Sequence, residues 1–405
     1  MNTKVGYARN VPRFFVFWAL YQFHLWMPIW VIFLQGRGMN LSQIGTLDAI
    51  GWVVMAAAEV PTGAVADTYG RKMSIVLGSL LTAFALAAVT ARVLSPLFLL
   101  GYMLWGSAFT FISGADMAFL YDSLKADGRT ADYPKVAGRY MAVMQGAQGV
   151  ASLVGAWVAA TFDMRWCFLG SAVVTLSSAA VALTFREPPR HENGASGVRR
   201  RYRDTVREAL RIAVERPAVR YLVPFSAVTA VVPFMMAFIL VQPYATAAGL
   251  PVWSLGAIVL AIRGVGVIGS MLSPSVAARV GNVRLVVAVP AAIVLCQLLL
   301  WVVPSRPAIA LFPALALASA LMRPVLSTLI NQQIPSEQRA TILSLGSLVW
   351  TLLLAVLEPA IFTLAARTSL PLAIGASGIV LVLTAGPLLV LWRRASTEVV
   401  PAPLA

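Results

Sequence analysis

Gly63-Ala-Val-Ala-Asp67-Thr-Tyr-Gly70-Arg71-Lys72 is a charged stretch with a glycine near each end, set between two long apolar segments. Its charged side chains are costly inside a bilayer, because an ionisable group near the bilayer centre costs at least about 2.5–3.5 kcal/mol. The two glycines are expected to let the backbone bend and approach other helices closely. We therefore predict a tight turn at a membrane surface.

The composition is that of a protein that crosses the membrane many times. Of the 405 residues, 59% are hydrophobic and 12% are charged, whereas soluble domains carry roughly 25% charged residues. The apolar residues form blocks long enough for membrane helices, which need about 20 residues each. They do not alternate with polar residues as in a transmembrane barrel. We predict an all-α membrane protein. The net charge of +15 lies in short loops, so it does not indicate nucleic-acid binding.

Twelve apolar segments are candidate transmembrane helices. They cover residues 13–34, 43–66, 73–91, 97–123, 137–161, 166–185, 219–242, 252–277, 285–303, 308–331, 340–362 and 369–392. The long connection after the sixth predicts an N-terminal six-helix bundle over 1–185, a cytoplasmic linker over 186–218 and a C-terminal six-helix bundle over 219–405. In the linker, apolar residues at helical spacing between arginines predict an amphipathic helix over 202–214. It is either a plain connection or a regulatory, lipid-sensing element.

Lysine and arginine are distributed unequally between the two sides. With the N-terminus in the cytoplasm, 24 of the 31 lie in segments predicted to be inside and five in segments predicted to be outside, while Arg263 and Arg323 lie within spans. Because cytoplasmic loops carry the excess of positive charge, both termini and the 63–72 turn are predicted to be cytoplasmic.

The two halves contain a weak internal repeat. Gly70-Arg71-Lys72-Met73 opens the third span, and Gly281-Asn282-Val283-Arg284 opens the ninth. Gly138-Arg139-Tyr140 opens the fifth, and Gln338-Arg339-Ala340-Thr341 opens the eleventh. Parallel halves with a long cytoplasmic connection are typical of one large group of transporters, whose substrate site lies near the middle of the membrane.

The spans, the repeat and the 63–72 turn together resemble the major facilitator superfamily. Three flanking segments, Glu59-Val-Pro61-Thr62-Gly63, Tyr121-Asp122-Ser123-Leu124-Lys125 and Arg339-Ala-Thr-Ile-Leu-Ser, resemble a bacterial branch of drug-efflux-like permeases. The resemblance implies two pseudo-symmetric six-helix bundles in a bacterial inner membrane. Three features depart from the pattern. Ala278 stands where the first half has Asp67, and the fifth span lacks the Gly-Pro pair of drug/proton antiporters. The fourth span also lacks the mid-span arginine motif of that group.

The resemblance also implies a conformational latch at the turn. In the superfamily, this cluster holds the first half to the start of the eleventh span in the outward-open state. Carried over to this chain, the latch residues are Gly63, Asp67, Gly70, Arg71, Asp122 and Arg339. Asp122 is the candidate partner of Arg71, because a guanidinium can donate two parallel hydrogen bonds to a carboxylate. The alternative is that Arg71 and Lys72 only fix the topology.

Ionisable and amide side chains within spans are candidates for proton coupling or substrate contact, since such residues usually face a cavity or each other. They are His24, Glu59, Asp116, Arg263, Arg323, Gln145 and Gln148. Asp116 is the first candidate for the proton, because a carboxylate in a low-dielectric cavity can exchange a proton near neutral pH. Glu59 and His24 have structural hydrogen bonding as the alternative. An arginine cannot carry the proton, but it can bind an anionic group.

Aromatic residues crowd two spans, the first at Trp18, Tyr21, Trp26 and Trp30 and the fourth at Tyr102, Trp105, Phe109, Phe111 and Phe119. Most are expected to form belts at the membrane interface or to face lipid. The alternative is an apolar, adaptable binding wall.

No nucleotide-binding loop, metal-ligand spacing or catalytic constellation is recognisable, and Cys167 and Cys296 lie in apolar segments. We predict a monomeric secondary transporter, not an enzyme, with no cofactor and with a proton gradient as its driving force. Its partners are a small-molecule substrate and the lipid bilayer. The favoured function is proton-coupled export of small amphipathic compounds by alternating access. The alternatives are import or exchange of a polar or anionic metabolite and, from another class, a non-transporting membrane sensor.

Overall fold

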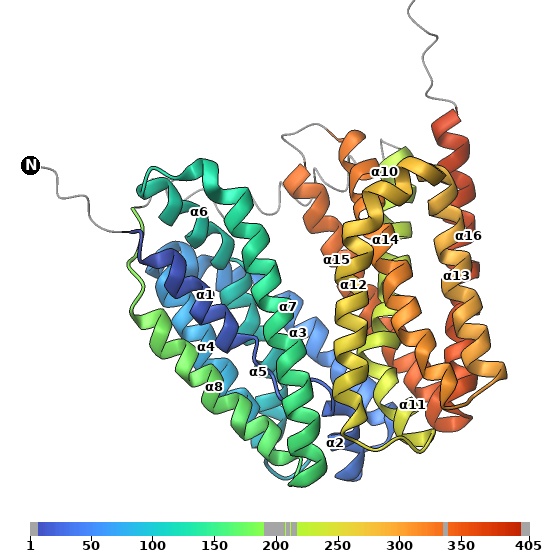
Figure 1. Ribbon diagram of the computed structural model, residues 1–405, viewed down its shortest axis with the longest axis horizontal. Coiled ribbons are helices and arrows are strands. Elements are labelled where there is room, and N and C mark those ends of the chain that lie inside the picture. The colour runs from blue at the N-terminus through green and yellow to red at the C-terminus, as the bar shows by residue number, and fades with distance from the viewer. Residues whose placement is uncertain (1–6, 190–206, 208–210, 212–216, 335–338, 398–405) are drawn as a thin grey trace, which may run out of the picture. The chain divides into compact units, whose positions relative to one another are not determined.

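The computed structural model describes residues 7–189, 207, 211, 217–334 and 339–397. All the regular elements in these residues are helical (Figure 1). The prediction of an all-α protein is therefore confirmed. The amphipathic helix predicted over 202–214 falls almost entirely outside the described residues.

The helices follow the predicted spans with differences at their ends. Those of the first half are α1 (Asn10–Tyr21), α2 (Trp30–Gly36), α3 (Leu41–Tyr69), α4 (Arg71–Ala88), α5 (Pro96–Ser113), α6 (Asp116–Ala126), η1 (Thr130–Asp132), α7 (Tyr133–Thr161) and α8 (Arg165–Leu183). Those of the second half are α10 (Pro217–Phe234), η3 (Met235–Leu240), α11 (Val241–Ala247), α12 (Ser254–Val280), α13 (Asn282–Val302), η4 (Pro307–Ala310), α14 (Leu311–Gln332), α15 (Arg339–Arg367) and α16 (Leu370–Thr397).

In the described part of the chain, eleven stretches are long and apolar enough to cross a membrane. Helices α5 and α6 together form one of them, and α10, η3 and α11 form another. The predicted first span is not among the eleven because it is divided into α1, with 12 residues, and α2, with 7. With this divided segment counted as a span, the structure agrees with twelve.

The first span is interrupted at residues 22–29, where the sequence suggested one continuous helix. Pro28 lacks a backbone N–H and disfavours helical geometry in the residue before it. The Leu25 N–H donates to the Ser171 hydroxyl of α8 at 2.9 Å, which satisfies a backbone group that the missing helix would have satisfied. Helix α7 passes so close that a Cβ on Gly155 would collide with the Leu25 carbonyl. The interruption is thus held in place by α7 and α8.

We expect Gly155→Ala to destabilise the protein by about 1–3 kcal/mol, the usual cost of forcing a methyl group into a close-packed site. The new methyl would meet backbone atoms of Leu25, which cannot move aside as a flexible side chain can. Thermal unfolding of the purified protein in detergent measures the effect. Gly146→Ala on the same helix is the matched control, because nothing lies within 4 Å of its Cβ position. Equal melting temperatures for the two variants would contradict the close contact between Gly155 and Leu25.

The first helix of the second half is also irregular. Helix α10 passes into the π-helix η3 before α11 begins. Pro233, just before η3, lacks the N–H that a regular helix would use. A π-helical turn widens the helix by one residue and shifts the register of the side chains that follow.

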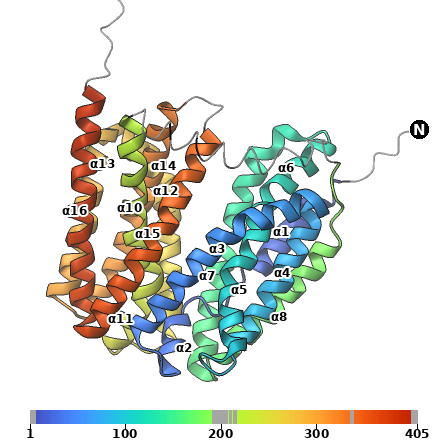
Figure 2. The ribbon, with the colours of Figure 1, turned by 180° about the vertical axis from the view of Figure 1, so that it is seen from behind.

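The chain divides into two compact units by its contacts. Unit 1 comprises Met1–Arg37, Ile50–Val198 and Pro251–Leu260, and unit 2 comprises Gly38–Ala49, Arg199–Leu250 and Ala261–Ala405. In unit 1, α4 packs against α5 and α8, and α1 packs against α7 and α8 (Figure 2). In unit 2, α10 packs against α14, α15 and α16. The bundle limits at residues 185 and 219 remain predictions.

The core of unit 1 is rich in aromatic rings. Phe14, Trp18 and Tyr21 of α1 are at most 2% exposed, and they belong to one buried cluster with Phe119 and Tyr140. The Trp18 and Tyr140 rings have centroids 5.1 Å apart, and such pairs contribute about 0.5–1.5 kcal/mol beyond their burial. The expectation that most aromatic residues of the first span lie in interface belts is therefore wrong, because these rings fill the interior of the unit.

Candidate functional site

The turn between α3 and α4 is a single residue, Gly70. Its φ of +110° and ψ of 152° form a conformation that residues with a side chain rarely adopt, so glycine is required there. Gly63 lies inside α3, and nothing lies within 4 Å of its Cβ position. The expectation that Gly63 bends the backbone is therefore wrong. Gly281, before α13, has φ +89° and ψ 140°, which matches Gly70 and supports the internal repeat.

Arg71 forms the contact that the sequence predicted. Its guanidinium makes an ion pair and a hydrogen bond with the Asp122 carboxylate of α6. The same nitrogen, Nη1, donates to the Ala118 carbonyl at 2.7 Å. The Arg71 and Asp122 side chains are 31% and 25% exposed, so water screens their attraction only in part. These contacts join the start of α4 to α6.

A second carboxylate at this turn belongs to Glu187, which was not among the predicted site residues. Its Oε1 accepts from the Arg71 backbone N–H at 2.9 Å, and its Oε2 accepts from the Lys72 N–H at 2.8 Å. These N–H groups have no partner inside the helix, and the helix dipole favours a negative charge at this end. Glu187 thus ties the chain after α8 to the start of α4. The available sequence signal was an acidic residue directly after the sixth span.

We expect Glu187→Ala to lower the free energy of unfolding by about 1 kcal/mol, the usual loss on removing a helix N-terminal cap. Glu187→Gln is expected to cost less, because its side-chain oxygen can still accept one of the two N–H groups. Thermal unfolding in detergent at low and high salt measures both variants. If Glu187→Ala has the same melting temperature as the parent protein at both salt concentrations, Glu187 does not cap α4.

Asn10 completes the connections at this end of unit 1. Its amide nitrogen donates to the Ser123 hydroxyl at 2.9 Å and to the Arg186 carbonyl at 2.8 Å. Its amide oxygen accepts from the Arg186 N–H at 3.0 Å. Asn10 is 1% exposed. It therefore fixes the start of α1 against α6 and against the chain that follows α8.

The remaining two latch residues, Asp67 and Arg339, do not test the predicted latch. Asp67 lies in the last turn of α3 and is exposed. Arg339 is the first residue of α15, but its side chain lies outside the part of the chain that the structure describes. The role of the turn in closing one half on the other therefore remains a prediction.

Asp116 is a buried carboxylate at the start of α6. It is 4% exposed. Its Oδ2 accepts a hydrogen bond from the Tyr140 hydroxyl of α7 at 3.1 Å, and its Oδ1 accepts from the Met117 N–H at 2.6 Å. The ion pairs found among the described residues do not include Asp116. The Asp116 carboxylate is therefore stabilised by its position at the start of α6 and by two hydrogen bonds, and not by a basic side chain among the described residues.

The interruption of the first span carries buried polar atoms with unused hydrogen-bonding capacity. Among the described residues, His24 Nδ1, Trp26 Nε1, Trp30 Nε1 and Gln148 Oε1 have no hydrogen-bond partner. The amide nitrogen of Gln148 donates to the Gln22 side-chain oxygen at 2.9 Å. Because buried polar atoms are normally satisfied, this region can bond to a bound molecule.

Ring contacts connect His24 to Asp116 within unit 1. The ring centroids of His24 and Tyr21 are 5.7 Å apart, and those of Tyr21 and Trp18 are 5.5 Å apart. The Trp18 ring in turn contacts Tyr140. Tyr140 donates to Asp116. Two of the predicted cavity residues are therefore connected through a continuous aromatic core.

The remaining predicted cavity residues are more dispersed. Gln145 on α7 is half-buried, and Glu59 on α3 is exposed. Arg263 and Arg323 belong to unit 2. The Arg263 guanidinium lies over the Phe238 ring, 6.0 Å from its centroid, and Arg323 is exposed. Neither unit by itself brings all seven candidates together.

Comparison with solved structures identifies the fold. A bacterial homolog of the human lysosomal transporter Spinster, in an inward-facing and unoccupied conformation, superimposes with a TM-score of 0.74 at 15% identity, and the match covers 100% of both chains. The nucleoside transporter NupG superimposes with a TM-score of 0.74 at 13% identity, and the match covers 97% of this chain and 100% of NupG. At such identities the likeness shows the fold alone.

Comparison of sequences identifies the family. An uncharacterized MFS-type transporter of Bacillus subtilis (strain 168), YxaM, is 28% identical over 91 residues, which make up 22% of this chain and 23% of YxaM. The aligned part is thus less than a quarter of that relative. A family model of the Major Facilitator Superfamily matches residues 14–357. Because this match covers most of its length, the chain belongs to the Major Facilitator Superfamily.

Proposed function

We propose that the protein is a proton-coupled secondary transporter that exports small amphipathic compounds by alternating access. The observation that carries the proposal is Asp116, a carboxylate that is 4% exposed and takes part in none of the ion pairs among the described residues. A buried charge without a counterion is costly. A change in its surroundings between two conformations would therefore load or release a proton.

The neighbours of Asp116 suit this role. The Tyr140 hydroxyl donates to the carboxylate, so it stabilises the charged form when the proton has left. The Met117 N–H does the same from the first turn of α6. The two donors bind different oxygens, so when one oxygen carries a proton the other still accepts its hydrogen bond. The carboxylate can therefore change its charge while it keeps at least one of these partners.

Export of amphipathic compounds is supported by the chemistry near the interruption of the first span. Buried indole rings at Trp26 and Trp30 provide apolar surface, and their N–H groups are without partners among the described residues. Gln148 adds a neutral acceptor. Rings with a few neutral hydrogen-bonding groups suit ligands that are mostly apolar. The segments that flank the turn also resemble drug-efflux-like permeases.

Import or exchange of a polar or anionic metabolite is the second candidate. It is favoured by Arg323, which is exposed on α14, and by Arg263 on α12. A guanidinium binds carboxylate and phosphate groups well. Structural neighbours with this fold include a nucleoside transporter and a D-xylose–proton symporter, which carry polar substrates.

We further propose that the protein lies in a bacterial inner membrane with both termini in the cytoplasm. The distribution of lysine and arginine supports this orientation. It places the Gly70 turn, the Arg71–Asp122 pair and Glu187 on the cytoplasmic side. Cysteine labelling at Arg129 and Thr368, exposed residues in loops predicted on opposite sides, tests the orientation.

Transport by purified protein in liposomes tests the function. A pH-sensitive dye inside the vesicles is followed while lipophilic cations, neutral aromatic compounds and organic anions are added under proton gradients of either sign. We expect proton movement with the amphipathic cations or neutral aromatics. Proton movement driven only by organic anions would favour the second candidate. No proton movement with any class, together with substrate flux, would overturn proton coupling.

A further inference from the structure

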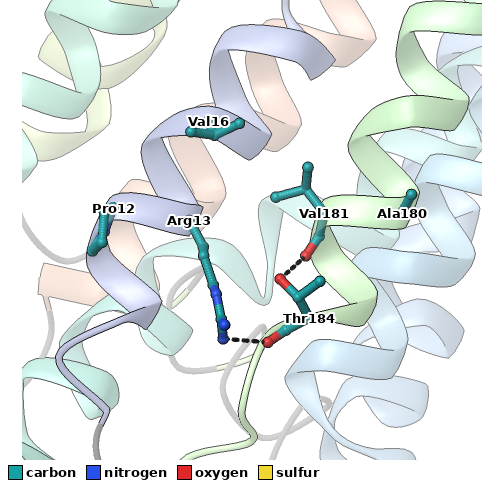
Figure 3. A pocket seen from close by; sticks show the side chains of 6 residues that line it. All are labelled: Pro12, Arg13, Val16, Ala180, Val181 and Thr184. Atoms are coloured by element: carbon teal, nitrogen blue, oxygen red, sulfur yellow. Dashed lines mark hydrogen bonds between the residues drawn. The ribbon is translucent and has the colours of Figure 1, made fainter.

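A groove lies between α1 and α8 in unit 1. It has a volume of about 480 Å³ and is lined by Pro12, Arg13, Val16, Ala180, Val181 and Thr184 (Figure 3). The Val16 side chain is 50% exposed. The Thr184 hydroxyl donates to the Val181 carbonyl at 2.7 Å, so the hydroxyl is used within its own helix. The groove therefore presents apolar atoms along almost its whole wall.

The charged end of the groove is formed by Arg13. One guanidinium nitrogen, Nη1, donates to the Thr184 carbonyl at 2.6 Å (Figure 3). Thr184 directly follows the last residue of α8, where a cation is favoured by the helix dipole. A guanidinium has five N–H donors, and this contact uses one nitrogen. The ion pairs among the described residues do not include Arg13.

A second arginine lies one helical turn before Arg13. Arg9 immediately precedes α1 and is exposed. Residues four apart lie on the same face of a helix, and the Arg13 N–H donates to the Arg9 carbonyl, so Arg9 extends the basic face of α1 beyond Arg13. An anion at this end of the groove would meet the charge of Arg13 first and that of Arg9 one turn away.

Polarity changes along the groove in the direction of the helices. Arg13 lies in the first turn of α1, and Val16 lies one turn further along. On α8, Ala180 lies one turn before Thr184. Charge is therefore confined to one end, and apolar side chains line the part that runs into the membrane span.

We propose that this groove binds an anionic phospholipid. The phosphate is held by the free donors of Arg13, with Arg9 contributing charge, and one acyl chain lies along Val16, Ala180 and Val181. An apolar groove between two membrane helices suits an acyl chain, and basic sites between such helices bind anionic head groups. A polar solute would find almost no partner along the apolar wall. The proposal does not depend on the direction of transport or on the substrate.

The bound lipid would act on the Gly70 turn through neighbouring contacts. Arg13 follows Asn10 by three residues on α1, and Asn10 holds Arg186. Arg186 precedes Glu187, which caps α4 at Arg71. A phosphate that stabilises Arg13 against the end of α8 would therefore also stabilise the chain that carries the cap.

Native mass spectrometry of the full-length protein in detergent tests the proposal. Dioleoylphosphatidylglycerol and dioleoylphosphatidylcholine are added separately at equal concentration. We expect selective retention of the phosphatidylglycerol. Arg13→Gln should weaken it about fivefold, equivalent to about 1 kcal/mol for one basic residue near a lipid phosphate, and Arg13→Lys should restore most of it. Ala180→Trp, at an exposed position, should block the groove and lower retention without altering the charge.

Arg92→Gln is the matched control, since it removes an exposed arginine from the loop after α4. It should retain phosphatidylglycerol as the parent does. Equal retention of the two lipids by the parent protein would overturn the proposal. So would equal phosphatidylglycerol retention by Ala180→Trp and the parent, or by Arg13→Gln and Arg92→Gln. Ala180→Trp and Arg13→Lys keep the test decisive even if Arg13→Gln fails to fold.

Discussion

Asp116→Asn is expected to abolish proton-driven transport while leaving the fold and substrate binding intact. The amide has nearly the size of the carboxylate, and its oxygen can still accept from the Tyr140 hydroxyl or from the Met117 N–H. It cannot exchange a proton. Dye-detected proton movement in liposomes should fall at least about tenfold, which corresponds to about 1.4 kcal/mol. Exchange of labelled substrate without a proton gradient should continue.

Tyr140→Phe is the matched control for Asp116. It removes one hydrogen bond to the carboxylate, keeps the ring against Trp18, and leaves the group that carries the proton. A partial loss with a changed pH dependence is expected. If Asp116→Asn moves protons at the parental rate, the assignment of the proton to Asp116 is wrong. Loss of substrate exchange by Asp116→Asn would instead place the residue in substrate binding.

Arg71→Ala is expected to have the largest effect at the Gly70 turn. It removes the ion pair with Asp122 and the hydrogen bond to the Ala118 carbonyl. The ion pair is partly exposed and contributes at most about 1 kcal/mol, and the charge-assisted hydrogen bond adds a similar or larger amount, so the loss of stability should be about 2 kcal/mol. Transport should fall while membrane insertion remains normal.

Lys72→Ala separates the latch from a purely topological role. It removes the same charge one residue further on, and its backbone N–H keeps its bond to Glu187. If the two basic residues only fix the topology, the two variants should behave alike. We expect Lys72→Ala to change stability by no more than about 0.5 kcal/mol, as for most surface substitutions, and to transport normally. If Lys72→Ala and Arg71→Ala lose equal stability and equal transport, the turn acts only as a topological signal.

The fold was predictable because membrane helices depend on long apolar segments, and these are visible in a single sequence. The contact of Arg71 with Asp122 was also predictable, because a buried or partly buried arginine needs an acid and few acids were available at the end of the fourth span. Gly63 was wrongly expected to bend the chain. A glycine in a helical context keeps helical geometry unless its neighbours force another conformation, and of the two glycines of the 63–72 stretch only Gly70 has positive φ.

Other features depended on contacts between segments far apart in the sequence. The cap from Glu187 on α4 joins residues 115 and 116 positions apart, and no local pattern marks such a pair. The burial of the first-span tryptophans was also missed. Hydropathy does not distinguish a ring that faces lipid from a ring that faces the core, so the aromatic connection from His24 to Asp116 required the structure.

The two irregular helices occupy matching places in the two halves. When Gly281 is aligned with Gly70, the π-helical segment at Met235–Leu240 falls opposite residues 24–29 of the interrupted first span. Each half therefore departs from regular helix at a corresponding position. The first half loses the helix there, and the second half keeps it with a single widened turn. Backbone that leaves regular helix at membrane depth is tolerated where the protein buries it. Both breaks meet this condition, since residues 24–29 are buried and Met235, Met236, Ile239 and Leu240 are at most 1% exposed.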